Sequence, residues 1–133
     1  MNRALASLAI GAILLAGCSP RNQTATTNSD STQMAERSER EHEVAARLDS
    51  TRARLDSLKS EAAVLGNKVN SATTAKIAEL EVEKDSAQVR FERLQQTGKE
   101  KWDEARMSFA NLLDSLDVRI DQARHNLRRP SKS

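Results

Sequence analysis

The feature that most constrains this chain is a stripe of residues that recurs at alternating spacings of four and three between positions 44 and 65. The stripe consists of Val44, Leu48, Thr51, Leu55, Leu58, Ala62 and Leu65. Within it, "ARLDSTR" is followed directly by "ARLDSLK", a tandem duplication of seven residues at 46–59. A period of 3.5 residues keeps one stripe of an α-helix facing a partner helix, as in a coiled coil. The segment therefore predicts a helix that buries one narrow seam against other helices.

Traced toward the N-terminus, the same register passes Glu41 and Arg37 before it reaches Met34. Charged residues at these positions remove apolar surface from the seam. We therefore predict that the helix begins near residue 34 and that its first two turns pack weakly.

A turn near residue 66 is expected to end this first helix. Gly66 suits the left-handed C′ position that closes many helices. Asn70 or Ser71 is a suitable N-cap for a second helix. That helix repeats the four-three spacing at Thr73, Ile77, Leu80, Lys84, Ala87, Phe91 and Leu94. Because two of these positions, Thr73 and Lys84, are polar, the second seam is expected to be weaker than the first.

A second turn is expected around "QQTGKE". Thr97 and Glu100 have the spacing of a capping box, which predicts that Thr97 is the N-cap of a third helix. Pro130 would end that helix. Its apolar residues are Trp102, Ala105, Phe109, Leu112, Leu113, Leu116, Ile120, Ala123 and Leu127. Their spacing drifts between two adjacent seams, which predicts a broader apolar face than that of the first helix.

The three predicted helices, 34–65, 70–96 and 98–128, are each about 40–48 Å long at 1.5 Å per residue. Similar lengths and short connections predict an all-α fold, an antiparallel three-helix bundle. A coiled-coil hairpin that completes its core by self-association is the alternative, because Arg37, Thr51 and Lys84 thin the core of a monomer. The predicted seam and interaction residues are Val44, Leu48, Leu55, Leu58, Leu65, Ile77, Leu80, Phe91, Leu94, Trp102, Phe109, Leu112, Leu116 and Ile120.

Charge and motif content remove several classes of function. The 133 residues include 21 Lys and Arg against 19 Asp and Glu, so there is no basic stripe for nucleic acid. Neither His42 nor His125 has a His, Cys or carboxylate three or four residues further on, as a metal site on one helix face requires. There is no glycine-rich phosphate loop and no glycine-flanked nucleophilic serine. We therefore expect a non-enzymatic protein with no catalytic, cofactor or metal site.

Residues 1–17 differ from the rest of the chain. Arg3 supplies a short basic start, and an apolar run over 4–16 follows it. This run is shorter than the roughly 20 residues that a membrane-spanning helix needs. It has the anatomy of a secretory signal peptide, so we expect residues 1–17 to be cleaved and to take no part in the fold.

The end of this segment together with the residue after it, Leu15-Ala16-Gly17-Cys18, resembles the lipobox of bacterial membrane lipoproteins. The resemblance implies cleavage between Gly17 and Cys18, a diacylglyceryl group on the Cys18 thiol and an acyl chain on its new amino group. Two or more acyl chains anchor a protein stably. Ser19 after the cysteine resembles the outer-membrane class, which implies a lipid-anchored protein on the periplasmic side of the outer membrane.

Residues 19–33, "SPRNQTATTNSDSTQ", contain no large apolar side chain and predict a disordered tether, with Cys18 as its lipidated first residue. Residues 129–133 predict a disordered tail. Lipobox, tether and heptad helix together are similar to the small coiled-coil lipoproteins of the outer membrane, such as the murein lipoprotein. The lysine by which that family joins the cell wall is not transferred, because Lys132 is followed by Ser133 and three helices replace one.

Two functions fit this organisation. The first is a lipid-anchored structural or interaction module of the cell envelope whose seam assembles with its own copies or with an envelope protein. The alternative is an amphipathic lipid-binding protein that opens on membranes, as apolipoprotein-like helices do. Trp102 and the broad face of the third helix favour this alternative. Arg124, Arg128 and Arg129 predict either a favourable interaction with the helix dipole or a contact with cell wall or anionic lipid.

Overall fold

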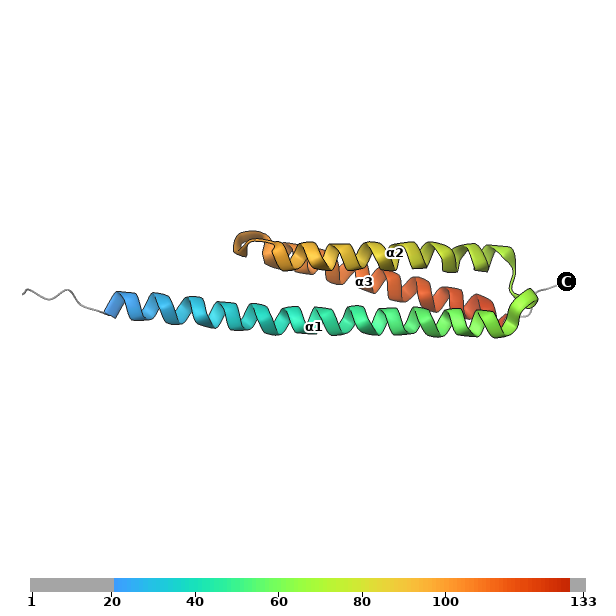
Figure 1. The fold of residues 1–133 in the computed structure, drawn as a ribbon, viewed down its shortest axis with the longest axis horizontal. Coiled ribbons are helices and arrows are strands. Elements are labelled where there is room, and N and C mark those ends of the chain that lie inside the picture. The colour runs from blue at the N-terminus through green and yellow to red at the C-terminus, as the bar shows by residue number, and fades with distance from the viewer. Residues whose placement is uncertain (1–20, 130–133) are drawn as a thin grey trace, which may run out of the picture. The chain divides into compact units, whose positions relative to one another are not determined.

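The computed structural model describes residues 21–129, with side chains from Ser29 onward. Its three long helices confirm the predicted all-α three-helix bundle, and residues 21–129 contain no strand (Figure 1). The bundle is one compact unit that begins at Ala35. The elements are α1 (Arg21–Leu65), the 3-10 turn η1 (Gly66–Lys68), α2 (Ser71–Gln96) and α3 (Lys99–Arg128).

Helix α1 begins at Arg21, so residues 21–33 are helical where the sequence predicted an irregular tether. Residues 21–65 contain no glycine or proline that would stop a helix. The Ser, Thr and Asn residues in this range each lower helix propensity by less than about 0.7 kcal/mol relative to Ala. The side chains of residues 29–36 are all exposed, so these turns bury no core. The predicted signal peptide, Cys18, Ser19 and residues 130–133 lie outside the described part of the chain.

The turn between α1 and α2 has the predicted local signals. Gly66 has a φ of 53°, in the left-handed region that ends a helix without steric cost only for glycine. Asn70 is the N-cap of α2, because its side-chain oxygen accepts a hydrogen bond of 2.8 Å from the backbone N–H of Thr73. Both features confirm the prediction for this turn.

The turn between α2 and α3 differs from the prediction. Thr97 does not cap the start of α3. It ends α2, where its backbone N–H donates to the Leu94 carbonyl at 3.1 Å and its hydroxyl donates to the Arg93 carbonyl at 2.8 Å. Gly98 is the N-cap of α3 and offers no side-chain hydrogen bond. A threonine hydroxyl can serve a helix end as donor or a helix start as acceptor, and the spacing to Glu100 does not distinguish the two.

The seam positions of all three helices meet in one core. Its buried apolar residues are Val44, Leu48, Leu55, Leu58, Ile77, Leu80, Ala87, Leu94, Trp102, Phe109, Leu113, Leu116, Ile120 and Ala123. Three predicted seam residues, Leu65, Phe91 and Leu112, are only half-buried. The rings of Phe91 and Phe109 nevertheless lie 5.9 Å apart, so Phe91 lines the edge of the core.

The predicted drift of the third seam is wrong. The inward positions of α3 keep a regular four-three spacing through Trp102, Arg106, Phe109, Leu113, Leu116, Ile120 and Ala123. Leu113 is fully buried, in place of the predicted Leu112. The apparent drift arose because Arg106 occupies a seam position, and its apolar neighbour Ala105 was taken for the seam residue.

Polar side chains interrupt the core without breaking it. Thr51 is 2% exposed, and its hydroxyl donates to the Asp117 carboxylate at 3.0 Å. Lys84 keeps its aliphatic stem in the seam while its ammonium lies 3.3 Å from Glu81. Thr51 and Lys84 thus have partners at the core edge, and the chain forms the three-helix bundle rather than the hairpin that the sequence left open.

Candidate functional site

The predicted interaction seam is used inside the chain itself. Leu55, Leu58 and Leu80 are each at most 1% exposed, although no second molecule is present. A residue buried in its own bundle cannot also bind a partner unless the bundle opens. Any contact that leaves the fold intact must therefore use the outer faces of the helices.

The outer faces carry few large apolar side chains. Those that are exposed among the described residues are Met34, Val64, Val82, Val89, Met107 and Val118. Val82 and Val89, seven residues apart on α2, share a face opposite the seam, at about 100° per residue. Isolated exposed apolar residues are ordinary on soluble proteins, so these positions do not mark a site.

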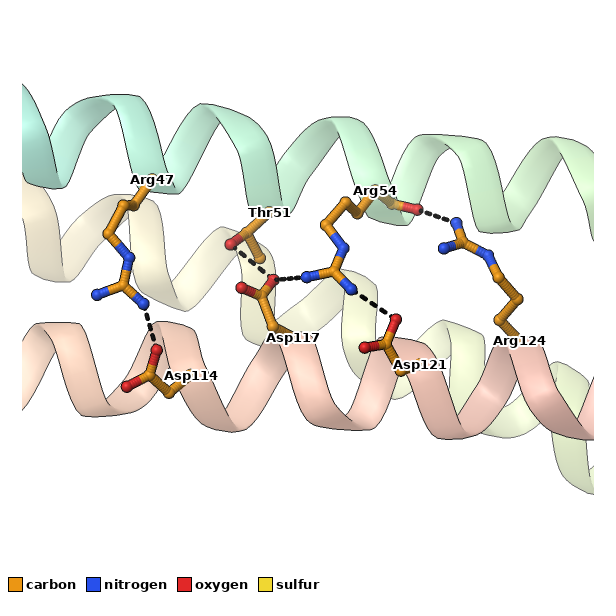
Figure 2. A network of polar contacts seen from close by, with 7 residues as sticks. All are labelled: Arg47, Thr51, Arg54, Asp114, Asp117, Asp121 and Arg124. Atoms are coloured by element: carbon orange, nitrogen blue, oxygen red, sulfur yellow. Dashed lines mark hydrogen bonds and ion pairs between the residues drawn. The ribbon is translucent and has the colours of Figure 1, made fainter.

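The most ordered polar feature is a set of cross-helix contacts between α1 and α3, here called the arginine ladder (Figure 2). Arg40 pairs with Asp103 at 3.3 Å, and Arg47 pairs with Asp114. Arg54 contacts two carboxylates, Asp117 at 3.3 Å and Asp121 at 2.5 Å. The arginines recur every seven residues because that spacing returns a helix to nearly the same face.

The last rung of the arginine ladder has the opposite polarity. Glu61 lies on α1 and its partner Arg124 lies on α3, with 3.3 Å between carboxylate and guanidinium nitrogen. Arg124 also donates to the backbone carbonyl of Arg54 at 3.2 Å (Figure 2). Residue numbers rise together along the two sides of the ladder, so α1 and α3 run in the same direction.

This order of charges fixes the register of the two helices. If α3 moved by one heptad in one direction, Arg54 would face Arg128 instead of Asp121. A move in the other direction would place Glu61 opposite Asp117. Like charges at such flanking positions disfavour an alignment. The arginine ladder therefore disfavours the neighbouring registers that the repeated apolar seam would tolerate.

The electrostatic effect of the arginine ladder is modest. Its hydrogen bond to Asp121 raises the pKa of Arg54 above the usual value, because the carboxylate favours the charged guanidinium. The Asp121 and Asp114 side chains are 58% and 63% exposed, and such pairs each contribute about 0–1 kcal/mol. Alignment, rather than stability, is therefore the main effect of the ladder.

Helix α2 is tied to its neighbours by similar contacts. Lys59 of α1 lies 2.9 Å from Glu81 of α2, and this hydrogen bond lowers the pKa of the Glu81 carboxyl. On the other side, Arg119 of α3 pairs with Glu83 and with Glu79. These contacts place oppositely charged side chains along each pair of helices in the bundle.

The predicted arginine cluster at the end of α3 is divided by the structure. Arg124 is committed to Glu61 and the Arg54 carbonyl, and it points toward α1 (Figure 2). Arg128 and Arg129 are exposed, and so is Lys68 in the η1 turn. One turn beyond the Glu61–Arg124 pair lie Leu65 and Arg128, so Lys68 belongs to the same end of the bundle as the two arginines.

No helix within residues 21–129 contains a stretch long and apolar enough to cross a membrane. In the same part of the chain, no three His, Cys, Asp or Glu side chains are grouped so that they could hold a metal ion. Comparison with known protein families, with curated proteins and with solved structures finds no match for this chain. No relative therefore supplies a role for any of these residues.

Proposed function

We propose that this chain is a lipid-anchored protein of the bacterial envelope, held at the periplasmic side of the outer membrane, whose helical bundle is a non-enzymatic structural or interaction module. The observation that carries the proposal is Leu15-Ala16-Gly17-Cys18 directly after a basic and apolar leader. The bundle follows this leader as a separate unit from Ala35, and the chain has no other cysteine. Lipid on Cys18 would thus hold a domain that folds without disulfides.

The internal seam supports a module that is presented whole. Because the seam residues pack within one chain, the bundle needs no copy of itself for its core. This differs from the sequence hypothesis, in which the seam itself held a partner. A partner of the intact bundle would meet its outer faces or its ends.

The end that carries Lys68, Arg128 and Arg129 is the part of the bundle best suited to an anionic surface. All three cations are exposed, whereas Arg124 is withdrawn into its pair with Glu61. This end lies about 45 Å along the bundle from Ala35, at 1.5 Å per residue over 35–65. The exposure and the common sign of these three charges support a contact of this end with cell-wall polymer or anionic lipid.

The anchor is tested by expressing the full chain and its Cys18→Ser variant in a Gram-negative host. We expect the wild-type chain to enter the detergent phase after Triton X-114 separation and to carry acyl mass on its N-terminal peptide. The variant should lose both properties. Equal partition of the two proteins, with no acyl mass on either, would contradict the proposal. Ser19→Asp, which keeps Cys18, should retain the lipid and shift the protein toward the inner-membrane fraction.

Trp102, which suggested the lipid-binding alternative, also provides the signal that distinguishes this alternative from the proposed envelope module. Trp102 is 4% exposed and the α3 seam is regular, so neither feature now favours opening on membranes. We expect a chain that begins at Ser19, without leader or lipid, to keep its Trp102 emission and helicity when mixed with anionic vesicles. A gain in helicity with a shift of Trp102 emission would support the alternative.

A further inference from the structure

The C-terminal end of α2 needs a partner from outside its own sequence. The last carbonyl groups of a helix have no intrahelical donor. At the end of α1, left-handed Gly66 turns the chain so that the Val69 N–H donates to the Gly66 carbonyl at 3.2 Å. Gly98 after α2 has a φ of −65°, outside the left-handed region, and its carbonyl accepts from the Lys101 N–H at 3.2 Å as the start of α3, so Gly98 does not close α2. Thr97 serves the carbonyls of Arg93 and Leu94, which leaves those further on to be satisfied.

Arg37 of α1 supplies donors for two of these carbonyls. Its Nη2 donates to the Thr97 carbonyl at 2.8 Å and to the Gln95 carbonyl at 3.2 Å, although Thr97 is 60 residues away in sequence. A guanidinium at this position also offsets the negative end of the α2 dipole. Arg37 therefore acts as a C-terminal cap for a different helix.

The same guanidinium covers the only tryptophan in the chain. The guanidinium carbon of Arg37 lies 5.2 Å from the centre of the Trp102 ring, within the range of a cation–π contact. Arg106, at a seam position of α3, lies 5.8 Å from the same ring. Trp102 is 4% exposed and is part of the apolar core, and the two guanidinium groups lie over its ring. One side chain of α1 thus joins the end of α2 to the start of α3.

We infer that Arg37 is a latch, whose release detaches residues 37–43 of α1 from the bundle and opens the end at which α2 turns into α3. All described side chains before it, 29–36, are exposed. The next buried side chain of α1 is Val44, because Glu41 is only half-buried. Arg37 therefore decides whether α1 joins the bundle at residue 37 or at residue 44.

The latch has a consequence for reach that rests on the proposed lipid anchor. Release frees the seven residues from Arg37 to Glu43, which span about 10 Å as helix and at most about 25 Å extended. The Arg40–Asp103 pair also holds this stretch, but its carboxylate is 69% exposed, so it contributes about 0–1 kcal/mol. An open latch would thus let an anchored bundle stand further from its membrane.

The latch is tested with Arg37→Gln in the full chain, purified in mild detergent so that the result does not depend on how the N-terminus is processed. We expect acrylamide quenching of Trp102 to rise about two-fold through local opening. Deuterium uptake should increase at residues 37–43 and 93–98, while far-UV circular dichroism stays nearly constant. Arg37→Lys, which keeps the charge but not the fork of donors, should be intermediate.

Arg40→Gln is the matched control, because it removes a cation one turn along α1 whose partner is an exposed carboxylate. It should leave both readouts unchanged. Quenching of the Arg37→Gln protein equal to that of the wild type would overturn the latch. If Arg37→Gln fails to fold, hydrogen exchange of the wild-type protein tests the latch instead. A latch requires slower exchange at residues 37–43 than at 29–36. Equal exchange in these two segments would overturn it, whereas loss of lipid from Cys18 would leave it intact.

Discussion

The two ends of the bundle are closed in opposite ways. At one end, the turn from α1 to α2 is built from neighbours in sequence: Gly66 provides the left-handed residue and Asn70 caps Thr73. At the other end, the turn from α2 to α3 is completed by Arg37 from α1, which reaches the Thr97 carbonyl and Trp102. A locally closed turn can form with two helices alone. The remotely closed turn requires all three helices, so it is expected to open first.

The largest loss of stability is expected from a substitution that disrupts the core shared by both ends. Leu55→Asp places a carboxylate at a position that is 1% exposed, and burying an unpaired charge there should cost at least about 4 kcal/mol. We expect loss of most helicity by circular dichroism and of both turns by hydrogen exchange. Ser57→Asp, on the exposed side of the same helix, is the control and should fold. Native helicity in Leu55→Asp would contradict the single shared core.

The next test acts on the locally closed end. Gly66→Ala meets no atom within 4 Å, so its cost comes from the φ of 53°, about 1–2 kcal/mol for a residue with a side chain. Urea unfolding measures this loss. Gly98→Ala is the control at the other end, because its backbone suits any residue. In Gly98→Ala, alanine stabilises the fold by reducing the freedom of the unfolded chain and destabilises it by being a poorer N-cap than glycine. These two effects on the free energy of unfolding nearly cancel. An equal loss of stability in Gly66→Ala and Gly98→Ala would contradict a left-handed glycine requirement at one end only.

A charge reversal tests whether the arginine ladder aligns the locally closed end. Glu61→Arg places two cations together at the last rung and should lower stability by about 1 kcal/mol. Glu61→Arg combined with Arg124→Glu should recover most of that loss, because the pair is restored with reversed polarity. Urea midpoints of the two single variants and the double variant give the coupling energy. A double variant as unstable as the sum of the singles would show that this rung does not couple the helices.

The smallest expected effect is a pH dependence from α2. The hydrogen bond from Lys59 lowers the pKa of Glu81, so this carboxylate stabilises the fold above its ordinary pKa, about 4.3. That contribution is lost as the pH falls through and below this value. Glu81→Gln should therefore flatten the dependence of the urea midpoint between pH 6 and 3. Asp85→Asn, at a 78% exposed carboxylate, should leave the slope unchanged.

The fold was predictable because its signals are local or periodic. Apolar spacing identified the seams of α1 and α2, and Gly66 and Asn70 identified their boundary. The contacts of Arg37 and Thr97 were not predictable in this way, since a cap supplied across 60 residues depends on how the helices align in space. The search for apolar residues also concealed the Arg106 position, which made the α3 seam look irregular.

The arginine ladder was partly visible in the sequence. Arg40 and Arg47 each follow a glutamate by four residues, a spacing that favours pairs within α1. In the structure they reach α3 instead, because flanking positions of a seam lie close to the neighbouring helix. The seven-residue spacing of Arg47 and Arg54 on one helix and of Asp114 and Asp121 on the other is the signal that would have found two of these rungs. The register between the two helices still had to come from the structure.

Burial of the single tryptophan at the remotely closed end gives the protein an asymmetric optical signal. Trp102 emission reports on the Arg37 end, whereas far-UV circular dichroism averages over all three helices. Heating curves from the two methods will coincide only if the bundle melts as one cooperative unit. An earlier fluorescence transition would show, in the unmodified protein, that the Arg37 end opens before the rest of the bundle.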